Sequence, residues 1–186
     1  MKFIIETKKK KHIFVLFHHS SYEDSKELKG FTNKCPDSQY VIFLDYDGGW
    51  TKEEVEANKI FLEKKYLINF HYLFKTNKGF HLISLDKVAF NRLRDILEDS
   101  LADPSFVKVP FMTSLHSSTL RLSEKAGNIP ELIKQYLDEV YFRCYMSGGH
   151  YELLKVAYPE IQKPKGDFDD TTLEDVQVVT YWSKPR

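Results

Sequence analysis

The chain has 186 residues, and its 27 Lys and Arg residues are balanced by 27 Asp and Glu residues. This length fits one domain with a small extension and is enough to bury a sizeable core. Hydrophobic residues at 42% and charged residues at 29% are ordinary for a globular protein, which excludes global disorder. The zero net charge argues against a protein that coats nucleic acid by bulk charge, although it leaves room for a local basic groove.

Targeting signals and cysteine chemistry are also constrained by the sequence. No apolar run approaches the ~18 residues of a membrane span, and no signal-peptide pattern opens the chain. We therefore expect a cytosolic or nuclear protein, by default a cytoplasmic one, without a membrane partner. The two cysteines, Cys35 and Cys144, are too few for a disulfide framework or a four-thiolate zinc site.

The N-terminal part is predicted to contain strands separated by a loop. Two short strands, at 3–5 and 12–17, flank a basic loop, and a polar loop rich in Ser, Lys, Asp and Gly follows at 18–38. Residues 40–44 form a continuous β-branched and aromatic run, which is typical of a strand buried on both faces. This strand ends in the sequence Asp45-Tyr46-Asp47-Gly48-Gly49.

The middle of the chain is predicted to alternate helices with a hairpin. Thr51 followed by Glu54 is a capping-box pattern, so a helix should begin at about 52 and end near 64–66. The Asn-Lys-Gly turn between two apolar runs indicates a hairpin. The elements predicted here are a helix at 52–66, a strand at 67–75, a turn at 76–79, a strand at 80–85 and an amphipathic helix at 87–101.

The remaining elements complete a recognisable order. We expect strands at 106–111 and 119–123 and a helix at 131–140, opened by Pro130. The order over 40–111 is then β-α-β-β-α-β, the ferredoxin-like arrangement of an RNA-recognition-type palm. The predicted fold class is therefore α+β: this palm, an additional N-terminal β unit and a C-terminal extension. We expect a core over 1–162, and a tail or linker over 163–186 in which Val176–Trp182 adds one strand at most.

Asp45 and Asp47 are the first candidate for chemistry. They occupy positions i and i+2 of a strand end, so both side chains point to one face of the sheet. Two adjacent carboxylates repel each other unless a cation neutralises them, and Mg²⁺ or Mn²⁺ prefers such hard oxygen ligands. The alternative is an ordinary strand-end turn, where Asp-Gly is common without any metal.

The hairpin turn is the second candidate. Thr76, Lys78 and the amide of Gly79 place hydrogen-bond donors where an oxyanion could bind. His81 follows on the next strand and shares its face with Gly79 and Ile83 by strand alternation. The alternatives are solvated turn lysines and a buried histidine paired with a backbone carbonyl.

The third candidate combines an acidic residue with a basic strand. Asp103 could turn toward the same face as Asp45 and Asp47, or it could be an Asx-turn residue before Pro104. Further along, alternation along a strand puts three side chains on one face, where they could hold a triphosphate. These three residues are Arg121, Ser123 and Lys125. The alternative is an edge strand whose charged side chains prevent it from pairing with other chains and aggregating.

Taken in order, these motifs resemble those of the archaeo-eukaryotic primase superfamily, which includes plasmid and viral primase-polymerases. The resemblance covers roughly residues 40–126, about half of the chain, and each motif is short. The matching segments are Phe43-Leu44-Asp45-Tyr46-Asp47, Thr76-Asn77-Lys78-Gly79-Phe80-His81, then Asp103, and finally Leu120-Arg121-Leu122-Ser123-Glu124-Lys125.

The resemblance implies a primase or primase-polymerase core that performs template-directed nucleotidyl transfer in the replication of a plasmid, virus or mobile element. It implies that Asp45, Asp47 and Asp103 hold two Mg²⁺ or Mn²⁺ ions. The residues implied to bind the nucleotide are Thr76, Lys78, Gly79, His81, Arg121, Ser123 and Lys125. The implied partners are nucleoside triphosphates, a single-stranded template and a separate helicase or accessory domain.

The chain also departs from the family's pattern. Thr76 stands where the family usually has Ser, and Asp103 is followed by Pro104 instead of lying in a hydrophobic strand. If Asp103 is not a ligand, Asp99 or Glu98 is the fallback, and a catalytically silent nucleic-acid-binding module becomes the alternative function. A replication-initiation nicking enzyme is discounted because the chain has no His-hydrophobe-His pair.

Overall fold

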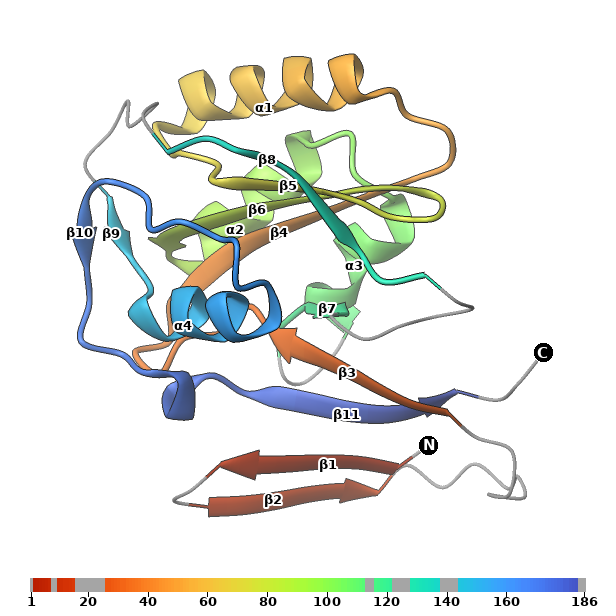
Figure 1. Cartoon of the computed structure of the whole chain (residues 1–186), viewed down its shortest axis with the longest axis vertical. Helices are drawn as coiled ribbons and strands as arrows, with labels where there is room; N and C mark the ends of the chain where they lie inside the picture. Colours follow the sequence, from red (N-terminus) through yellow and green to blue (C-terminus); the bar gives the residue numbers. More distant parts are fainter. Residues whose placement is uncertain are drawn as a thin grey trace.

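The computed structural model describes residues 2–7, 10–15, 26–112, 116–121, 128–137 and 144–183. The strands are β1 Lys2–Thr7, β2 Lys10–Val15, β3 Lys26–Thr32, β4 Tyr40–Asp47, β5 Tyr72–Lys75, β6 Gly79–Val88, β7 Thr119–Arg121, β8 Glu131–Gln135, β9 Tyr145–Met146, β10 Asp167–Phe168 and β11 Val178–Ser183. The helices are α1 Lys52–Tyr66, α2 Phe90–Asp99, α3 Pro104–Met112, α4 Gly148–Ala157 and a 3₁₀ turn, η2, Leu173–Asp175. The predicted α+β class is confirmed (Figure 1).

The central sheet contains the strand that carries Asp45 and Asp47. β6 pairs antiparallel with β4 and with β5, and β8 extends the sheet beyond β5. At its far end β6 also pairs with β9, which in turn pairs parallel with β10. Five elements of the predicted palm order are therefore present in sequence, namely β4, α1, β5, β6 and α2, and β6 lies between β4 and β5.

A second sheet has the order β2-β1-β11-β3-β7 in the part of the chain that the structure describes. It joins the predicted N-terminal hairpin, β1 and β2, to segments that are far away in sequence. β11 lies between β1 and β3, so the strand expected within Val176–Trp182 is present and is internal to the sheet. Residues 163–186 were expected to form a tail; they contribute β10 to one sheet and β11 to the other.

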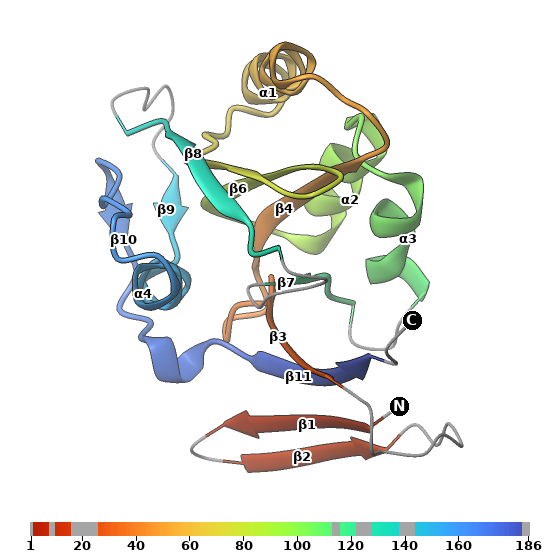
Figure 2. The same ribbon diagram turned by 45° about the vertical axis from the view of Figure 1, so that its right-hand side comes forward.

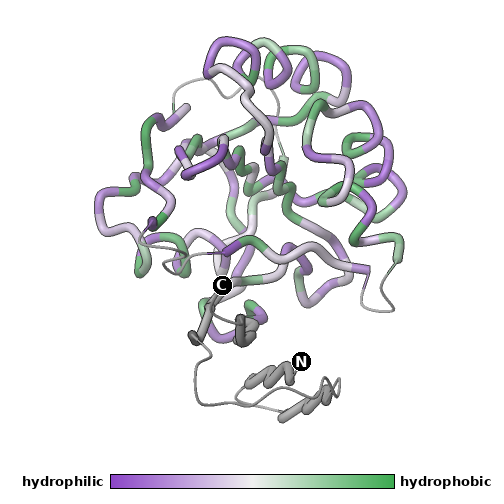
Figure 3. Tube along the Cα trace, turned by 90° about the vertical axis from the view of Figure 1, so that its right-hand side faces the viewer, coloured by the Kyte–Doolittle hydropathy of each residue, from purple (hydrophilic) through white to green (hydrophobic). Residues whose placement is uncertain are grey.

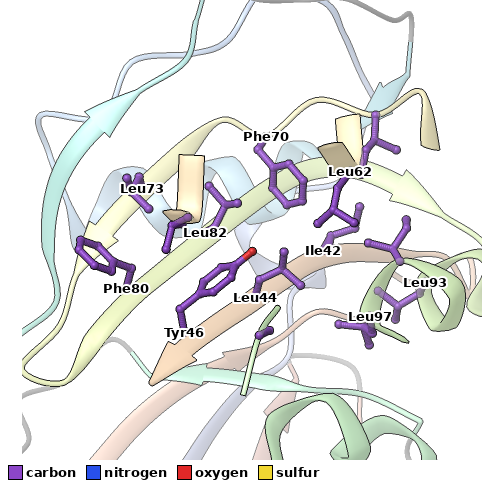
Figure 4. Close-up of a cluster of buried hydrophobic side chains, with 14 of the residues drawn as sticks. Ile42, Leu44, Tyr46, Leu62, Phe70, Leu73, Phe80, Leu82, Leu93 and Leu97 are labelled. Atoms are coloured by element: carbon purple, nitrogen blue, oxygen red, sulfur yellow. The ribbon is translucent and has the colours of Figure 1, made fainter. Parts of the chain in front are cut away.

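One face of the central sheet is covered by α1 and α2. The helix α1 begins at the predicted capping box, because Thr51 Oγ1 accepts from Glu54 N and the Glu54 carboxylate accepts from Thr51 N. Apolar side chains from β4, β5, β6 and both helices form the core on this face (Figure 4). The fully buried members include Leu44, Tyr46, Val55, Leu62, Leu73, Leu82, Leu93 and Ile96.

The opposite face of the sheet packs against α4 and the second sheet. Its core contains Phe43, Phe74 and Ile83 from the central sheet, together with Phe31 of β3 and Leu154 of α4. Figure 2 shows α4 next to β9 and β10, away from α1. The helical turns in Figure 3 alternate between hydrophobic and hydrophilic residues, as expected for helices that cover a sheet on one side only.

The strand predicted at 106–111 is wrong, because this segment belongs to α3. The Asp103 carboxylate accepts from the backbone N–H groups of Ser105 and Phe106, which fixes the first turn of a helix. Pro104 occupies the first helical position, where its missing N–H costs nothing. The last strand of the predicted β-α-β-β-α-β order is therefore absent from the described residues, and a helix replaces it.

Two further predictions are wrong. The helix expected at 131–140 is instead the strand β8 over Glu131–Gln135, because the open edge of β5 offers it backbone partners; residues 138–140 lie outside the described ranges. The loop expected at 18–38 contains the strand β3, which pairs with β11 and β7. Within the described ranges, no helix combines the length and the apolar character needed to cross a lipid bilayer.

Candidate functional site

Asp45 and His81 are direct neighbours across the central sheet. Asp45 of β4 pairs with His81 of β6, and His81 pairs on its other side with Phe74 of β5. The Nε2 atom of His81 lies 3.4 Å from Oδ1 of Asp45. Because directly paired residues share a face, this row points to the side of the sheet that packs against α4 and the second sheet.

His81 is held in its neutral form by its surroundings. Burial, followed by the nearby positive charge of Arg121, lowers the pKa of His81 to about 3. The imidazole therefore carries no charge near neutral pH. It can donate or accept a hydrogen bond next to Asp45, but it does not act as a cation there.

Asp47 completes the pair of carboxylates predicted at the end of β4. It pairs with Gly79, two residues along β4 from the pair of Asp45 and His81. Its side chain is half-buried and lies on the same face of the sheet as that of Asp45. Among the described residues, no hydrogen bond or ion pair involves the Asp47 carboxylate. The Asp45 side chain is 25% exposed, so both carboxylates are close to solvent at the strand end.

The two carboxylates fit one divalent cation. Mg²⁺ is commonly bound by one or two carboxylates, with water and substrate phosphates as its other ligands. No cluster of three or more His, Cys, Asp or Glu side chains suited to a metal ion occurs in the described part of the chain. The carboxylate pair could therefore supply protein ligands for one ion, and a second ion would need a further ligand.

The backbone of Asp103 lies next to Asp45, but the Asp103 side chain caps the first turn of α3. The amide of Asp103 donates to the carbonyl oxygen of Asp45, with an N···O distance of 2.7 Å. Its Oδ1 atom accepts from the N–H groups of Ser105 (2.7 Å) and Phe106 (3.2 Å) and from the Ser105 hydroxyl. These hydrogen bonds, the Ser105 hydroxyl first, lower the pKa of Asp103. Oδ1 is thus occupied as a helix cap, while Oδ2 takes part in none of these bonds.

The fallback ligands lie elsewhere. Asp99 accepts from Lys65 Nζ at 2.5 Å and from the Tyr66 hydroxyl, both at the end of α1. Glu98 is paired with Arg94 one turn earlier on the exposed surface of α2. Both carboxylates therefore belong to the helical layer that covers the other face of the sheet.

The hairpin turn uses its own donors internally. Thr76 Oγ1 accepts from the backbone N–H groups of Lys78 (3.3 Å) and Gly79 (3.0 Å), so the Gly79 amide is already bonded within the turn. Gly79 also has a packing role: a Cβ atom there would lie 1.6 Å from the carbonyl oxygen of Tyr46. Of the predicted turn donors, the exposed Lys78 side chain is left for a ligand.

Arg121 is brought to this face by the second sheet. It lies at the end of β7 and pairs with Gly30 of β3, and its charge acts on both His81 and Tyr158. In the described part of the chain, the Nε atom of Arg121 is buried and has no hydrogen-bond partner. Ser123 and Lys125, the other two predicted residues of this motif, lie outside the described residues.

Tyr158 is a residue of this region that the sequence did not indicate. It follows α4 as its C-cap, and its ring centroid lies 4.8 Å from that of Phe74, the neighbour of His81. Its hydroxyl is buried and, among the residues that the structure describes, lacks a hydrogen-bond partner. Burial, followed by the charge of Glu160, raises the pKa of Tyr158 to about 12 against the opposing charge of Arg121. A lone tyrosine after an unpredicted helix carries no motif, so only the fold reveals it.

A separate buried polar cluster lies beneath α1, on the other face of the sheet. His71 Nδ1 accepts from Leu85 N at 3.0 Å, so the proton of the neutral ring is on Nε2, which lies 3.8 Å from Asp86 Oδ1. Asp86 Oδ2 accepts twice from Asn69. Burial, followed by the charge of Lys59, lowers the pKa of His71 to about 3. With its Nε2 protonated, His71 is unsuited to bind a metal, and we assign the cluster a structural role.

No protein-family model matches the chain, and neither the curated proteins nor the solved structures contain a match.

Proposed function

We propose that this protein is the catalytic core of a primase or primase-polymerase, which joins nucleotides on a template with the help of Mg²⁺ or Mn²⁺. The observation that supports this proposal is the convergence of Asp45, His81 and Arg121 on one face of the central sheet. These residues come from three motifs that are separated in sequence: Asp45 and His81 are paired near the end of β4, and the charge of Arg121 acts on His81. The β4-α1-β5-β6-α2 order agrees with a palm of the primase type.

The proposed chemistry divides between acidic and basic side chains. Asp45 and Asp47 would hold a divalent ion, which when bound supplies positive charge to the reacting phosphate and to the attacking hydroxyl. Arg121, with the Lys78 side chain, would bind phosphate oxygens that become more negative in the transition state. The neutral His81 would contribute a hydrogen bond beside Asp45 without adding charge. Such positioning and charge stabilisation are the main demands of phosphoryl transfer.

A two-ion reaction requires a third carboxylate. Asp103 is the candidate, since its backbone is bonded to Asp45 and its Oδ2 atom is left out of the helix cap. In this proposal Asp103 therefore has two roles, one for each oxygen. Thr76 would act indirectly, by fixing the turn that carries Lys78.

The proposed partners are nucleoside triphosphates and a single-stranded template. A chain with equal numbers of acidic and basic residues has little bulk attraction for nucleic acid, so we expect weak, strongly salt-dependent template binding by this core. A separate helicase or accessory domain would then supply further affinity.

The proposal is tested by incorporation of labelled nucleotides on a single-stranded template, with and without a primer, in Mg²⁺ and in Mn²⁺. The wild-type protein is expected to extend or initiate a strand, and Asp47→Ala is expected to do neither. Absence of incorporation by the folded wild-type protein with both metals would contradict the proposal.

One observation favours a second candidate, a catalytically silent nucleic-acid-binding module on the same fold. The Asp103 carboxylate is used as a helix cap, and the described residues contain no three-ligand metal group. This candidate predicts that the wild type binds a single-stranded oligonucleotide without incorporating nucleotides, and that Asp47→Ala leaves the binding unchanged.

A further inference from the structure

Arg121 and Tyr158, on the side of the central sheet that His81 faces, each bury one polar atom. Among the described residues, the Nε atom of Arg121 and the hydroxyl of Tyr158 are both shielded from solvent and form no hydrogen bond. Tyr158 as a whole is 7% exposed. Buried donors of this kind are normally satisfied, because leaving them unpaired destabilises the fold, so each such exception requires an explanation.

The position of the Tyr158 hydroxyl is fixed by the packing of α4. The backbone N–H of Tyr158 donates to Leu154 O at 2.8 Å, and its carbonyl accepts from Ile161 N at 3.0 Å. The ring packs against Phe74, which is paired with His81 in the sheet. The hydroxyl is therefore held rigidly in the neighbourhood of the row that contains Asp45.

Arg121 supplies the charge of this neighbourhood. Leu120, the residue before Arg121, packs in the same buried core as Phe74 and Tyr158, and the positive charge of Arg121 acts on both His81 and Tyr158. The Nε–H group of arginine can only donate, and the phenol hydroxyl can donate as well. A ligand that offered an acceptor to each of them would satisfy both groups, and a negatively charged oxygen would also match the guanidinium.

We propose that Tyr158 and Arg121 form an oxyanion subsite, in which the Tyr158 hydroxyl and the Arg121 Nε–H donate to one phosphate group of the nucleotide triphosphate. This inference rests on the proposed function for the identity of the anion. It gives Tyr158, which no motif of the chain indicates, a direct contact with the substrate. It also explains why the residue that caps α4 buries a hydroxyl with no hydrogen-bond partner in the described ranges.

The subsite can be tested without catalysis, by titrating sodium tripolyphosphate into the protein in a calorimeter in the absence of metal. The test variants are Tyr158→Phe, which keeps the ring against Phe74, and Arg121→Gln. We expect each variant to bind tripolyphosphate about tenfold more weakly, as for the loss of a hydrogen bond to a charged group. A single-stranded oligonucleotide, titrated in parallel, distinguishes a triphosphate site from a site for the nucleic-acid backbone.

Tyr72→Phe is the matched control, since Tyr72 is a buried tyrosine whose hydroxyl already donates to Gln162 O at 2.9 Å. We expect Tyr72→Phe to lower the Tm and to bind tripolyphosphate like the wild type. Tyr158→Phe should show the opposite pattern, with an unchanged or higher Tm because no hydrogen bond is lost, and with weaker binding. This combination separates a ligand contact from a structural role.

The outcomes separate the inference from the proposed function. If tripolyphosphate binds to the wild type and Tyr158→Phe weakens it, the subsite is supported, even if no nucleotide incorporation is ever detected. The inference is overturned if the wild type does not bind tripolyphosphate or if Tyr158→Phe binds it equally well. Weakening of oligonucleotide binding alone also overturns it. In each of these cases incorporation by the wild type would leave the proposed function standing.

Discussion

The backbone amide of Asp103 donates a hydrogen bond to the carbonyl oxygen of Asp45, at 2.7 Å. The chain thus touches the edge of β4 opposite β6, in the place where a fourth strand of a ferredoxin-like sheet would pair. It makes this backbone contact and then turns into α3. The contact places the third predicted carboxylate beside the first, while the Asp103 side chain begins a helix.

Asp103 can be tested with two substitutions that separate capping from ligand binding. Asp103→Ala removes the cap and should lower the free energy of unfolding by about 1 kcal/mol, whereas Asn caps helices as well as Asp and should preserve stability. If Oδ2 also binds an ion, both variants should incorporate nucleotides more slowly. Urea unfolding and the incorporation assay measure the two effects.

The informative variant is Asp103→Asn. A stable Asp103→Asn protein with reduced incorporation supports a metal ligand. Incorporation equal to that of the wild type would limit Asp103 to its capping role and leave Asp45 and Asp47 as the acidic site.

Asp47 offers the cleanest test of the acidic site. Its carboxylate is half-buried and takes part in no hydrogen bond within the described ranges, so Asp47→Asn should leave the Tm unchanged. We expect incorporation to fall at least about 100-fold, because a bound ion contributes several kcal/mol to transition-state stabilisation. Asp95→Asn, an exposed carboxylate on α2, is the control and should retain full activity. Equal activity of Asp47→Asn and Asp95→Asn would rule out the acidic site.

Gly79 is predicted to be required for folding. A Cβ atom at this position would lie 1.6 Å from Tyr46 O and 2.7 Å from Tyr46 C, so β4 and β6 would have to separate. Gly79→Ala should therefore lower the free energy of unfolding by about 2 kcal/mol or more. The neighbouring Lys78→Ala, on an exposed side chain, should change stability by less than about 0.5 kcal/mol. Chemical denaturation of the two variants makes the comparison, and a stable Gly79→Ala protein would contradict the packing argument.

The parts of the fold that sequence could predict are those with local signals. The capping box at Thr51 and Glu54 placed the start of α1, and the Asn-Lys-Gly turn placed the β5–β6 hairpin. The alternation around His81 also gave the correct face of β6. In each case the pattern and the tertiary structure favour the same local conformation.

The errors arose where a long-range contact or an overlooked cap decides the structure. Residues 106–111 have strand-like composition, but the Asp103 cap and Pro104 start a helix before them. Residues 131–135 could form either element, and the free edge of β5 selects a strand. Tyr158 could not be found at all, since its proximity to Arg121 exists only after α4 and β7 have packed on the sheet.

Three buried histidines make stability dependent on pH. Burial lowers the pKa values of His71 and His81 to about 3 and that of His150 to about 4. Between these values and the ordinary pKa of 6.5, the unfolded chain binds protons that the folded chain does not. Stability is therefore complete above about pH 6.5 and is lost as the pH falls, by about 1.4 kcal/mol per pH unit for each histidine.

Asp86 acts in the opposite direction. Burial raises its pKa from 3.8 to about 6, so between these values the folded protein binds a proton that the unfolded chain has released. Its contribution to stability therefore grows as the pH falls from about 6 toward 4. Over this window it cancels the effect of one histidine, and the net slope should correspond to two protons.

The opposite effects of pH on the histidines and on Asp86 give a paired prediction for His71 and Asp86, whose Nε2 and Oδ1 atoms lie 3.8 Å apart. His71→Asn should flatten the dependence of unfolding free energy on pH between about 4.5 and 6 by about 1.4 kcal/mol per unit, whereas Asp86→Asn should steepen it by a similar amount. Urea denaturation at pH 4.5, 5.5 and 6.5 measures both slopes against the wild type. If both substitutions changed the slope in the same direction, the structure's pairing of a neutral His71 with an Asp86 that is protonated below about pH 6 would be contradicted.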